Sequence, residues 1–366
     1  MTPVELSHTV LHAVRSAVDE GELAVAVPET VKVAPPGPGG CGDYATNVAL
    51  RLAQPAGRPA AEVAEVLRAR LLRAGGVRDV AVTGPGFLNI SLAGDADAAL
   101  VRRIRDEGMR YGHGDALAGR TVTLRVPREI RAEVVAEVTA RLIGAQGGRA
   151  CVTQVAHGES ADIRPVPAPG DPAPLGPAAA RWALLHPAPH DRPSLGGEHL
   201  AQREDNPLFR VRYAHARARA AARNAAQLGF TAEPGPMDTV AETPAGPMDT
   251  VAGIPAGPTD TVADTPADTP ANAATAATAP ALLRALADHP RVLAQAARAH
   301  APDRLARHLV TVADATLEFL THAAVLPTGE EKPSAAHRAR LALAEAAGTV
   351  LAGGLTLLGI DAPEHL

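Results

Sequence analysis

A segment past the middle of the chain carries arginines at a spacing that suits a polyanionic ligand. Residues 207–228 are predicted to form one long helix, which holds Arg210, Arg212, Arg217, Arg219 and Arg223. Three of these, Arg212, Arg219 and Arg223, lie seven and four residues apart, so they share one face and are candidate phosphate contacts. The same spacing also fits a solvated helix face, so charge alone does not decide for nucleic acid.

Other residue combinations that support catalysis or metal binding are absent from the sequence. It contains no Gly-rich phosphate loop, no metal-binding cluster and no Ser/His/Asp arrangement. Cys41 and Cys151 are its only cysteines, which is too few for a disulfide framework or a zinc site and favours a reducing compartment. The sequence therefore predicts no catalytic residue, no metal ligand and no cofactor.

Composition favours a helical, soluble protein. Of the 366 residues 46% are apolar but only 2% are aromatic, so the core must consist of Ala, Leu and Val, which favour helices. The N-terminus lacks a basic region followed by an apolar one. Uninterrupted apolar stretches stay short of the roughly 20 residues that a membrane span needs. We expect a cytoplasmic protein that does not enter membranes.

The elements that must position these residues fall into three parts. Residues 1–110 are predicted to form a small α+β domain, 111–175 a remnant or linker, and 176–366 an antiparallel helical bundle, which makes the fold mainly α. In the first part, helices are expected at 3–20, 43–54, 59–74 and 95–107, β-prone runs at 24–27 and 31–34, and a strand pair at 80–83 and 87–92. In the rest, strands are expected at 121–126 and 151–155, a loop at 158–175, and helices at 127–145, 177–185, 207–228, 281–288, 290–299, 302–326 and 334–359.

One region, 231–280, interrupts the helical pattern. It repeats an eleven-residue unit three times, at 235–245, 246–256 and 257–267, as GPMDTVAETPA and close variants. Each unit has too few large apolar residues to offset the entropy of ordering, so we predict a disordered insertion; a repeat solenoid is the competing interpretation. The region holds seven acids and no Lys or Arg, so without it the net charge rises from −5 to +2.

Both ends of the chain resemble the arginyl-tRNA synthetases. Gly42-Asp43-Tyr44-Ala45-Thr46-Asn47, followed by Gly84-Pro85-Gly86-Phe87-Leu88-Asn89, is similar to their N-terminal additional domain. Asn206-Pro207-Leu208-Phe209 with Tyr213-Ala214-His215-Ala216-Arg217 resembles the opening of their DALR-type anticodon-binding domain. The terminal segment 354–364 and the stretch 176–182 also resemble family segments. The resemblance covers about 1–110 and 176–366 without the repeats, and it indicates a truncated paralogue.

The resemblance implies roles for particular side chains. Phe87 and Asn89 correspond to residues that contact the tRNA D-loop, where an aromatic face stacks on an unpaired base and an amide bonds to a base edge. The alternative for Phe87 is a core position in a strand. Tyr213 corresponds to a residue near the anticodon, and Arg217 is a candidate phosphate contact. His215 is expected to pack or hydrogen-bond rather than to catalyse, while Asp43 is expected to cap a helix.

The sequence departs from the family at the anticodon side and in the middle. Arg210 replaces an aromatic residue, Arg212 replaces a Gln, and Leu366 stands where the family has Met, which weakens a claim of anticodon specificity. Neither the His-x-Gly-His nor the Lys-Met-Ser-Lys signature of class I synthetases is present, and the only lysines are Lys32 and Lys332. These signatures stabilise the phosphates of the adenylation transition state. The ATP and arginine sites are therefore expected to be lost.

Three functional hypotheses follow. The first is a tRNA-binding protein without catalytic activity. The second is an interaction module whose former tRNA surfaces bind a protein partner. The third is an enzyme, either an arginine–tRNA ligase that obtains missing parts in trans or an unrelated activity in the middle segment. The sequence leaves the bound tRNA, any protein partner and the oligomeric state open.

Overall fold

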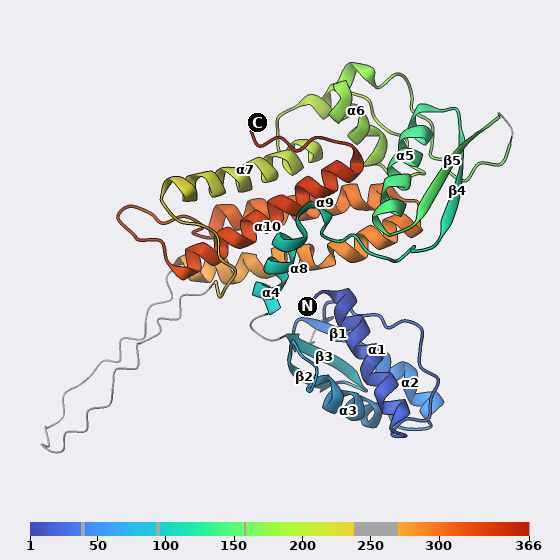
Figure 1. The fold of residues 1–366 in the computed structure, drawn as a ribbon, viewed down its shortest axis with the longest axis vertical. Helices are drawn as coiled ribbons and strands as arrows, with labels where there is room; N and C mark the ends of the chain where they lie inside the picture. Colours follow the sequence, from blue (N-terminus) through green and yellow to red (C-terminus); the bar gives the residue numbers. More distant parts are fainter. Residues whose placement is uncertain (38–40, 93–95, 157–158, 238–269, 366) are drawn as a thin grey trace, which may run out of the picture.

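Two hydrophobic cores divide the part of the chain that the structure describes. The computed structural model describes residues 1–37, 41–92, 96–156, 159–237 and 270–365 (Figure 1). The smaller core contains buried residues between Leu6 and Ile90, and the larger contains buried residues between Leu100 and Ile360. A mainly helical fold with a small N-terminal α+β unit is confirmed.

The N-terminal unit packs three helices on a three-stranded antiparallel sheet. Its elements are α1 (Pro3–Asp19), β1 (Tyr44–Thr46), α2 (Val48–Ala56), α3 (Ala60–Leu71), β2 (Val77–Thr83) and β3 (Phe87–Leu92). The strand order is β1-β3-β2, with Tyr44 opposite Ile90 and Thr83 opposite Phe87. The predicted capping box begins α1, since Thr2 Oγ1 accepts from the backbone N–H of Glu5 and the Glu5 carboxylate accepts from that of Thr2.

A parallel β-α-β unit stands at one end of the larger body. It comprises β4 (Thr121–Pro127), α5 (Ile130–Ala145) and β5 (Arg149–Val155), with Thr121 paired to Arg149 and Pro127 to Val155. Leu124, Val126 and the buried face of α5 belong to the larger core. The structure thus groups this unit, and α4 (Ala96–Glu107) before it, with the helical body, whereas the sequence predicts a separate middle segment.

Arg131, at the start of α5, fixes the loop that follows the β-α-β unit. Its side chain is 1% exposed and donates to five backbone carbonyls, all at 2.7–3.0 Å. The acceptors are Leu184, Val166, Asp191, Pro187 and Ala188. All five N–H donors of the guanidinium are thereby used. Arg131 therefore holds the Pro- and Gly-rich loop, through Val166, and the segment that follows α6 against the start of α5.

Four long helices form the rest of the larger body (Figure 1). They are α7 (Pro207–Gln227), α8 (Pro270–Arg298), α9 (Pro302–His322) and α10 (Ala335–Leu358), and they follow the short helices η1 (Gly108–Arg110), η2 (Ala173–Leu175), α6 (Gly176–Leu185) and η3 (Gly197–Leu200). Helices α7 and α9 both pack on α10, which also contacts α4. Figure 1 shows α4 on the side of this bundle that faces the N-terminal unit.

Helix α10 is apolar enough to raise the question of a membrane. By length and composition it is the one described helix that could cross a bilayer, with a mean hydropathy of 1.7 in its most apolar window. However, 72% of that window is buried inside the protein, where Leu343, Leu351 and Leu355 are fully enclosed. These are the properties of a core helix, and they give no indication of a membrane span.

Several predicted boundaries are wrong. Asp43 does not cap a helix: residues 44–46 form β1, α2 begins after Asn47, and the Asp43 carboxylate accepts from Leu92 N at 2.8 Å. The β-prone runs at 24–27 and 31–34 form no strand and contribute one isolated bridge, between Ala34 and Ala45. Finally, α8 is one helix through Pro280 and Pro290, because burial of leucines on its inner face outweighs the hydrogen bonds that the prolines omit.

The predicted disordered insertion at 231–280 is too wide at both ends. At its N-terminal end, Ala232 is buried in the larger core, as is Phe230 just before the region. Glu233 N donates to Arg338 O at 3.1 Å. At its C-terminal end, α8 begins at Pro270, eleven residues before the predicted helix. Almost all of the repeats, from residue 238 to 267, lie outside the described residues, so both the prediction of disorder and the solenoid alternative remain untested.

Candidate nucleic-acid interface

Helix α7 is held at its start by Asn206. The side-chain oxygen of Asn206 accepts from Leu208 N at 3.1 Å and Phe209 N at 3.4 Å, while its amide donates to the carbonyls of His199 and Ala201. Pro207 occupies the first helical position, where the missing N–H costs nothing. The cap thus fixes where α7 begins and which side chains it turns outward.

An aromatic ladder runs along the outer face of α7. The rings of Phe209 and Tyr213 stack with centroids 5.4 Å apart and planes inclined by 9°, and the Arg217 guanidinium lies 5.9 Å from the Tyr213 centroid. These residues are four apart, so the helix places them in succession on one face. Tyr213 is 39% exposed. An exposed aromatic stack that ends in a guanidinium is suited to stacking on unpaired bases.

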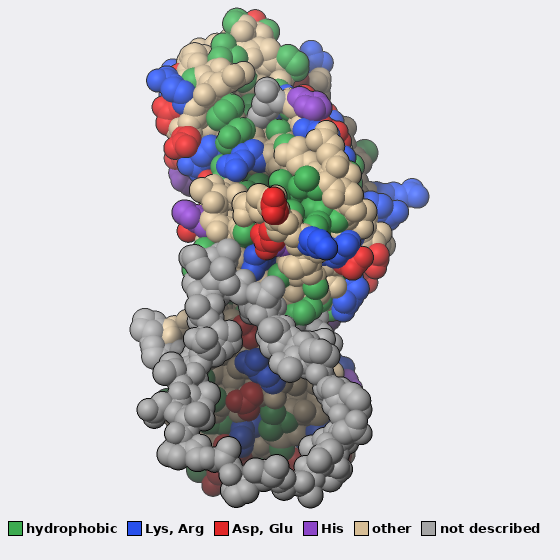
Figure 2. Space-filling view, turned by 90° about the vertical axis from the view of Figure 1, so that its left-hand side faces the viewer, with side chains coloured by type: hydrophobic (Ala, Val, Ile, Leu, Met, Phe, Trp, Pro, Cys, Tyr) green, Lys and Arg blue, Asp and Glu red, His purple; other side chains and the backbone are tan. Residues whose placement is uncertain are grey.

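The remaining arginines of α7 flank this ladder and are paired with acids. Arg210 Nη2 lies 2.9 Å from Asp314 on α9, and Arg212 Nη2 lies 2.6 Å from Asp361. Arg219 and Arg223 both approach Glu364, at 2.8 and 3.8 Å. Acidic and basic side chains are likewise interspersed on the molecular face that Figure 2 shows. The predicted shared face of Arg212, Arg219 and Arg223 exists, but its charge is largely balanced within the chain.

A hollow of about 370 Å³ opens beside the first residues of the ladder. Phe209, Arg212 and Asp361 line one side of it, and residues of α6 and η3 line the other. The Arg212–Asp361 ion pair stands at the edge between this hollow and the arginine face. The hollow is therefore bordered by an aromatic ring, a cation and a carboxylate.

His215 faces inward from the same helix. Its ring is 5% exposed, and Nδ1 donates to the Gly348 carbonyl at 3.0 Å across the α7–α10 contact. Burial lowers the pKa of His215, so the ring is neutral at physiological pH. The expectation that His215 hydrogen-bonds within the fold is confirmed.

The N-terminal hairpin presents one of its two predicted contact residues. Phe87 is 41% exposed and lies outside the smaller core, so the alternative that it is a core residue is wrong. Asn89 is 2% exposed and its amide donates to Thr83 Oγ1 at 2.6 Å on the neighbouring strand. Direct contact of Asn89 with RNA stays a prediction, and the geometry gives this amide the role of tying β2 to β3 behind Phe87.

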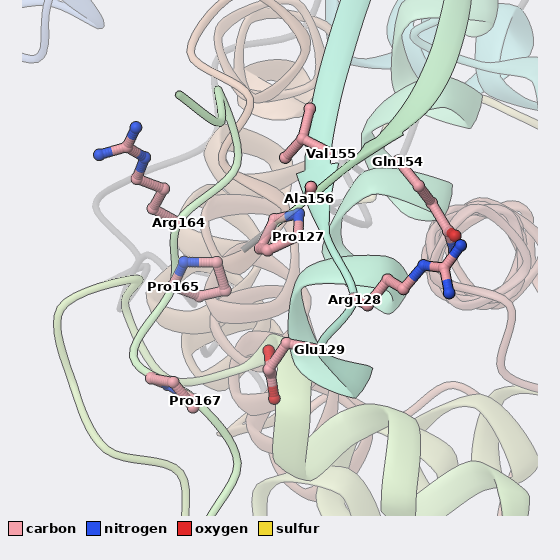
Figure 3. A pocket seen from close by; sticks show the side chains of 9 residues that line it. All are labelled: Pro127, Arg128, Glu129, Gln154, Val155, Ala156, Arg164, Pro165 and Pro167. Atoms are coloured by element: carbon pink, nitrogen blue, oxygen red, sulfur yellow. The ribbon is translucent and has the colours of Figure 1, made fainter. Parts of the chain in front are cut away.

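A second hollow, of about 700 Å³, lies at the carboxyl ends of β4 and β5 (Figure 3). Only Arg128 and Glu129 separate β4 from α5. The Glu129 carboxylate accepts from Ala132 N at 2.8 Å, and it also accepts from Ala168 N at 3.0 Å, in the segment that runs past Pro165 and Pro167. The free N–H groups at the start of α5 thus already face a carboxylate from this chain.

Sequence reasoning missed Phe209 as part of the interface and missed the acids that face the arginines. Phe209 was identifiable from its spacing, because it stands four residues before Tyr213 and eight before Arg217. The partners Asp314, Asp361 and Glu364 lie between 104 and 149 residues further along the chain than the arginines they face. Only the path of the chain after α10 brings the last two onto α7, so spacing alone could not identify them.

Comparison with known proteins agrees with this geometry at both ends of the chain. Residues 5–92 match the family described as arginyl tRNA synthetase N terminal domain, and residues 259–366 match the DALR anticodon binding domain. The arginine–tRNA ligase of Frankia alni is 46% identical over 124 residues, and that of Renibacterium salmoninarum is 45% identical over 127. Each match covers 34% of this chain but only 22–23% of the relative.

The fold as a whole is similar to a solved synthetase. The arginyl-tRNA synthetase of Thermus thermophilus aligns over 100% of both chains with a TM-score of 0.63, at 14% sequence identity. An identity this low establishes likeness of fold only. Together with the two domain matches, it shows that this chain is related to the arginyl-tRNA synthetases and combines their N-terminal domain with their DALR anticodon-binding domain.

Proposed function

We propose that this protein binds tRNA without charging it, and that the Phe209–Tyr213–Arg217 ladder on α7 contacts the unpaired bases. The ladder is the observation that carries the proposal, because its rings are stacked, partly exposed and backed by the core of the helical domain. Stacking on aromatic side chains is sequence-tolerant, which suits a surface whose neighbouring positions differ from the synthetase pattern.

The absence of charging activity is proposed from the β4–α5 junction. Class I chemistry needs phosphate-binding groups at the carboxyl ends of parallel strands, where helix N–H groups stabilise negative charge. Here the Glu129 carboxylate accepts from one of these N–H groups, that of Ala132, and places its own negative charge at the start of the helix. A triphosphate at this position would meet electrostatic repulsion and would have to displace a cap worth about 1 kcal/mol. We propose that the ATP and arginine sites are both lost.

Phe87 supplies a second contact in this proposal. It stands at the tip of the β2–β3 hairpin of the N-terminal unit, next to a turn that holds Gly84 and Gly86 at positive φ. A side chain at Gly86 would be strained, since φ is 137° and an added Cβ would lie 3.0 Å from Ala60. One tRNA bridging Phe87 and the α7 ladder would explain why both ends persist together, and it would place the protein in the cytoplasm with its ligand.

The proposal is tested by titrating labelled tRNA with the full chain at several salt concentrations. Saturable binding that weakens steeply with salt is expected for a protein that neutralises several phosphates. Tyr213→Ala should weaken binding by about 1–3 kcal/mol, while Tyr213→Phe, which keeps the stacking ring, should bind like the parent. Equal loss in both variants would refute stacking at this position.

The rival functions are tested with the same preparation. If tRNA does not bind at low salt, the interaction-module hypothesis replaces this proposal. Its supporting observation would be that α7 already binds carboxylates, as an acidic protein surface would offer. ATP–pyrophosphate exchange in the presence of arginine and tRNA tests the enzyme hypothesis. Measurable exchange would overturn the assignment as non-catalytic.

A further inference from the structure

The segment after α10 is directed back over α7. Gly359 ends the helix in the left-handed conformation, with φ at 73°, and Ile360 N donates to Leu355 O at 2.9 Å. Ile360 is 3% exposed and anchors the turn in the larger core. Residues 361–365 therefore start from a fixed point beside α7, and Figure 1 shows them running alongside it.

The carboxylates of this segment meet the arginine face. Asp361 Oδ2 accepts from Arg212, and Glu364 Oε1 accepts from Nε of Arg219 at 3.0 Å. Arg223 Nη2 lies 3.3 Å from the Glu364 carbonyl and 3.4 Å from Nδ1 of His365. All three arginines of the shared face, Arg212, Arg219 and Arg223, are thus in contact with the segment 361–365, which we call the acidic tail.

From these contacts we propose that the acidic tail is an intramolecular competitor of RNA, with Asp361 and Glu364 occupying the positions of two backbone phosphates on α7. The proposal rests on the function proposed above and adds its regulation: tRNA must displace the tail before Arg212, Arg219 and Arg223 become available. Carboxylate and phosphate oxygens bind guanidinium groups with the same geometry, so one replaces the other without rebuilding the surface.

The exposure of the contacts makes the competition reversible. The side chains of Asp361 and Glu364 are 68% and 50% exposed, and the three arginines are 23–45% exposed. Ion pairs this open to solvent are individually weak, so a polyanion with many charges outcompetes two carboxylates. The Phe209–Tyr213–Arg217 ladder lies beside the acidic tail. In the described part of the chain, no member of the ladder forms an ion pair with the acidic tail. Stacking can thus begin while the tail is still in place.

The test neutralises the tail and compares it with a matched control. The Asp361→Asn/Glu364→Gln variant removes two charges that face α7. The Glu204→Gln/Asp205→Asn variant removes two charges just before α7, where Asp205 is paired with Arg203 and not with the arginine face. Competition predicts that the tail variant binds tRNA about 5- to 30-fold more tightly than the control variant at low salt. It also predicts that the tRNA affinity of the tail variant falls more steeply with salt than that of the control variant. The control variant, like the parent, must release two internal ion pairs when it binds.

The outcomes separate this proposal from the function on which it rests. If the parent binds tRNA and the tail variant binds no tighter than the control, competition is wrong while tRNA binding stands. If neither parent nor tail variant binds, both proposals fail. If only the tail variant binds, both are supported, with the tail closed in the parent.

Discussion

A buried histidine pair at the contact between η1, α8 and α9 should make the helical body unfold more readily in mild acid. His289 is 2% exposed and stacks on Tyr111 on one side and on His308 on the other, with centroids 5.9 and 5.3 Å away. Among the described residues, Nδ1 of His289 and Nε2 of His308 have no hydrogen-bond partner. A proton on either ring would therefore be buried without an acceptor.

The sign and size of the effect follow from the pKa of His308. Burial lowers it from its usual 6.5 to about 4, against the smaller raising effect of Asp288, and the cation of Arg291 lowers it further. Burial likewise lowers the pKa of His289, and the neighbouring His308 and His113 add to that. Between pH 6.5 and 4 the unfolded chain therefore binds protons that the folded chain does not. Stability falls as pH drops through this window, and His308 alone removes about 2 kcal/mol between pH 7 and pH 5.

The assay uses the single tryptophan, which belongs to the same core. Trp182 is fully buried, so its fluorescence reports unfolding of the helical body in urea. Between pH 7 and pH 5, the free energy of unfolding should fall by about 2 kcal/mol less in His308→Gln than in the parent. His322→Gln, at an exposed position on the same helix, should keep the parental pH dependence. An identical pH dependence in the parent and in His308→Gln would refute the reasoning.

Two further predictions concern residues that hold the site in place, and both are measured from the urea midpoint of the Trp182 transition. Arg131→Met should destabilise the helical body by at least about 3 kcal/mol, because five backbone carbonyls, two of them in buried hydrogen bonds, lose their donors; a change below about 0.5 kcal/mol would contradict this. Asn206→Ala should cost about 1–2 kcal/mol through loss of the α7 cap and of two loop contacts, while Asn206→Asp, which keeps the accepting oxygen, should cost less.

Local signals in the sequence located most elements correctly. The capping box at Thr2, the Gly84-Pro85-Gly86 turn and the Asn206-Pro207 start of α7 each act within a few residues, so they are legible without the fold. Tertiary contacts overrode local preference elsewhere. The prolines at 280 and 290 suggested helix ends, but Ala279 and the leucines at 282, 283, 286 and 293 are buried and keep α8 continuous.

The candidate site divides in the same way. The face shared by Arg212, Arg219 and Arg223 follows from helical spacing and was predictable. Their pairing with Asp361 and Glu364 depends on the turn at Gly359 and on burial of Ile360, which no spacing rule gives. Burial of Asn89 likewise depends on the sheet order β1-β3-β2, in which β3 is central and Asn89 lies between Ala45 on β1 and Ala81 on β2.

The contrast between α7 and the β4–α5 junction explains how binding can outlast catalysis. The ladder needs only one capped helix, because residues four apart on a helix are neighbours. Its stacking therefore does not depend on the β4–α5 junction. A phosphate-binding centre needs free N–H groups, a loop long enough to surround the ligand and cations brought from other segments. Two residues between β4 and α5 leave no room for such a loop, and the Glu129 carboxylate already accepts from the Ala132 N–H at the start of α5. Under the proposed function, adenylation is therefore lost at this junction, while the surface on α7 does not depend on it and would be regulated separately by the acidic tail.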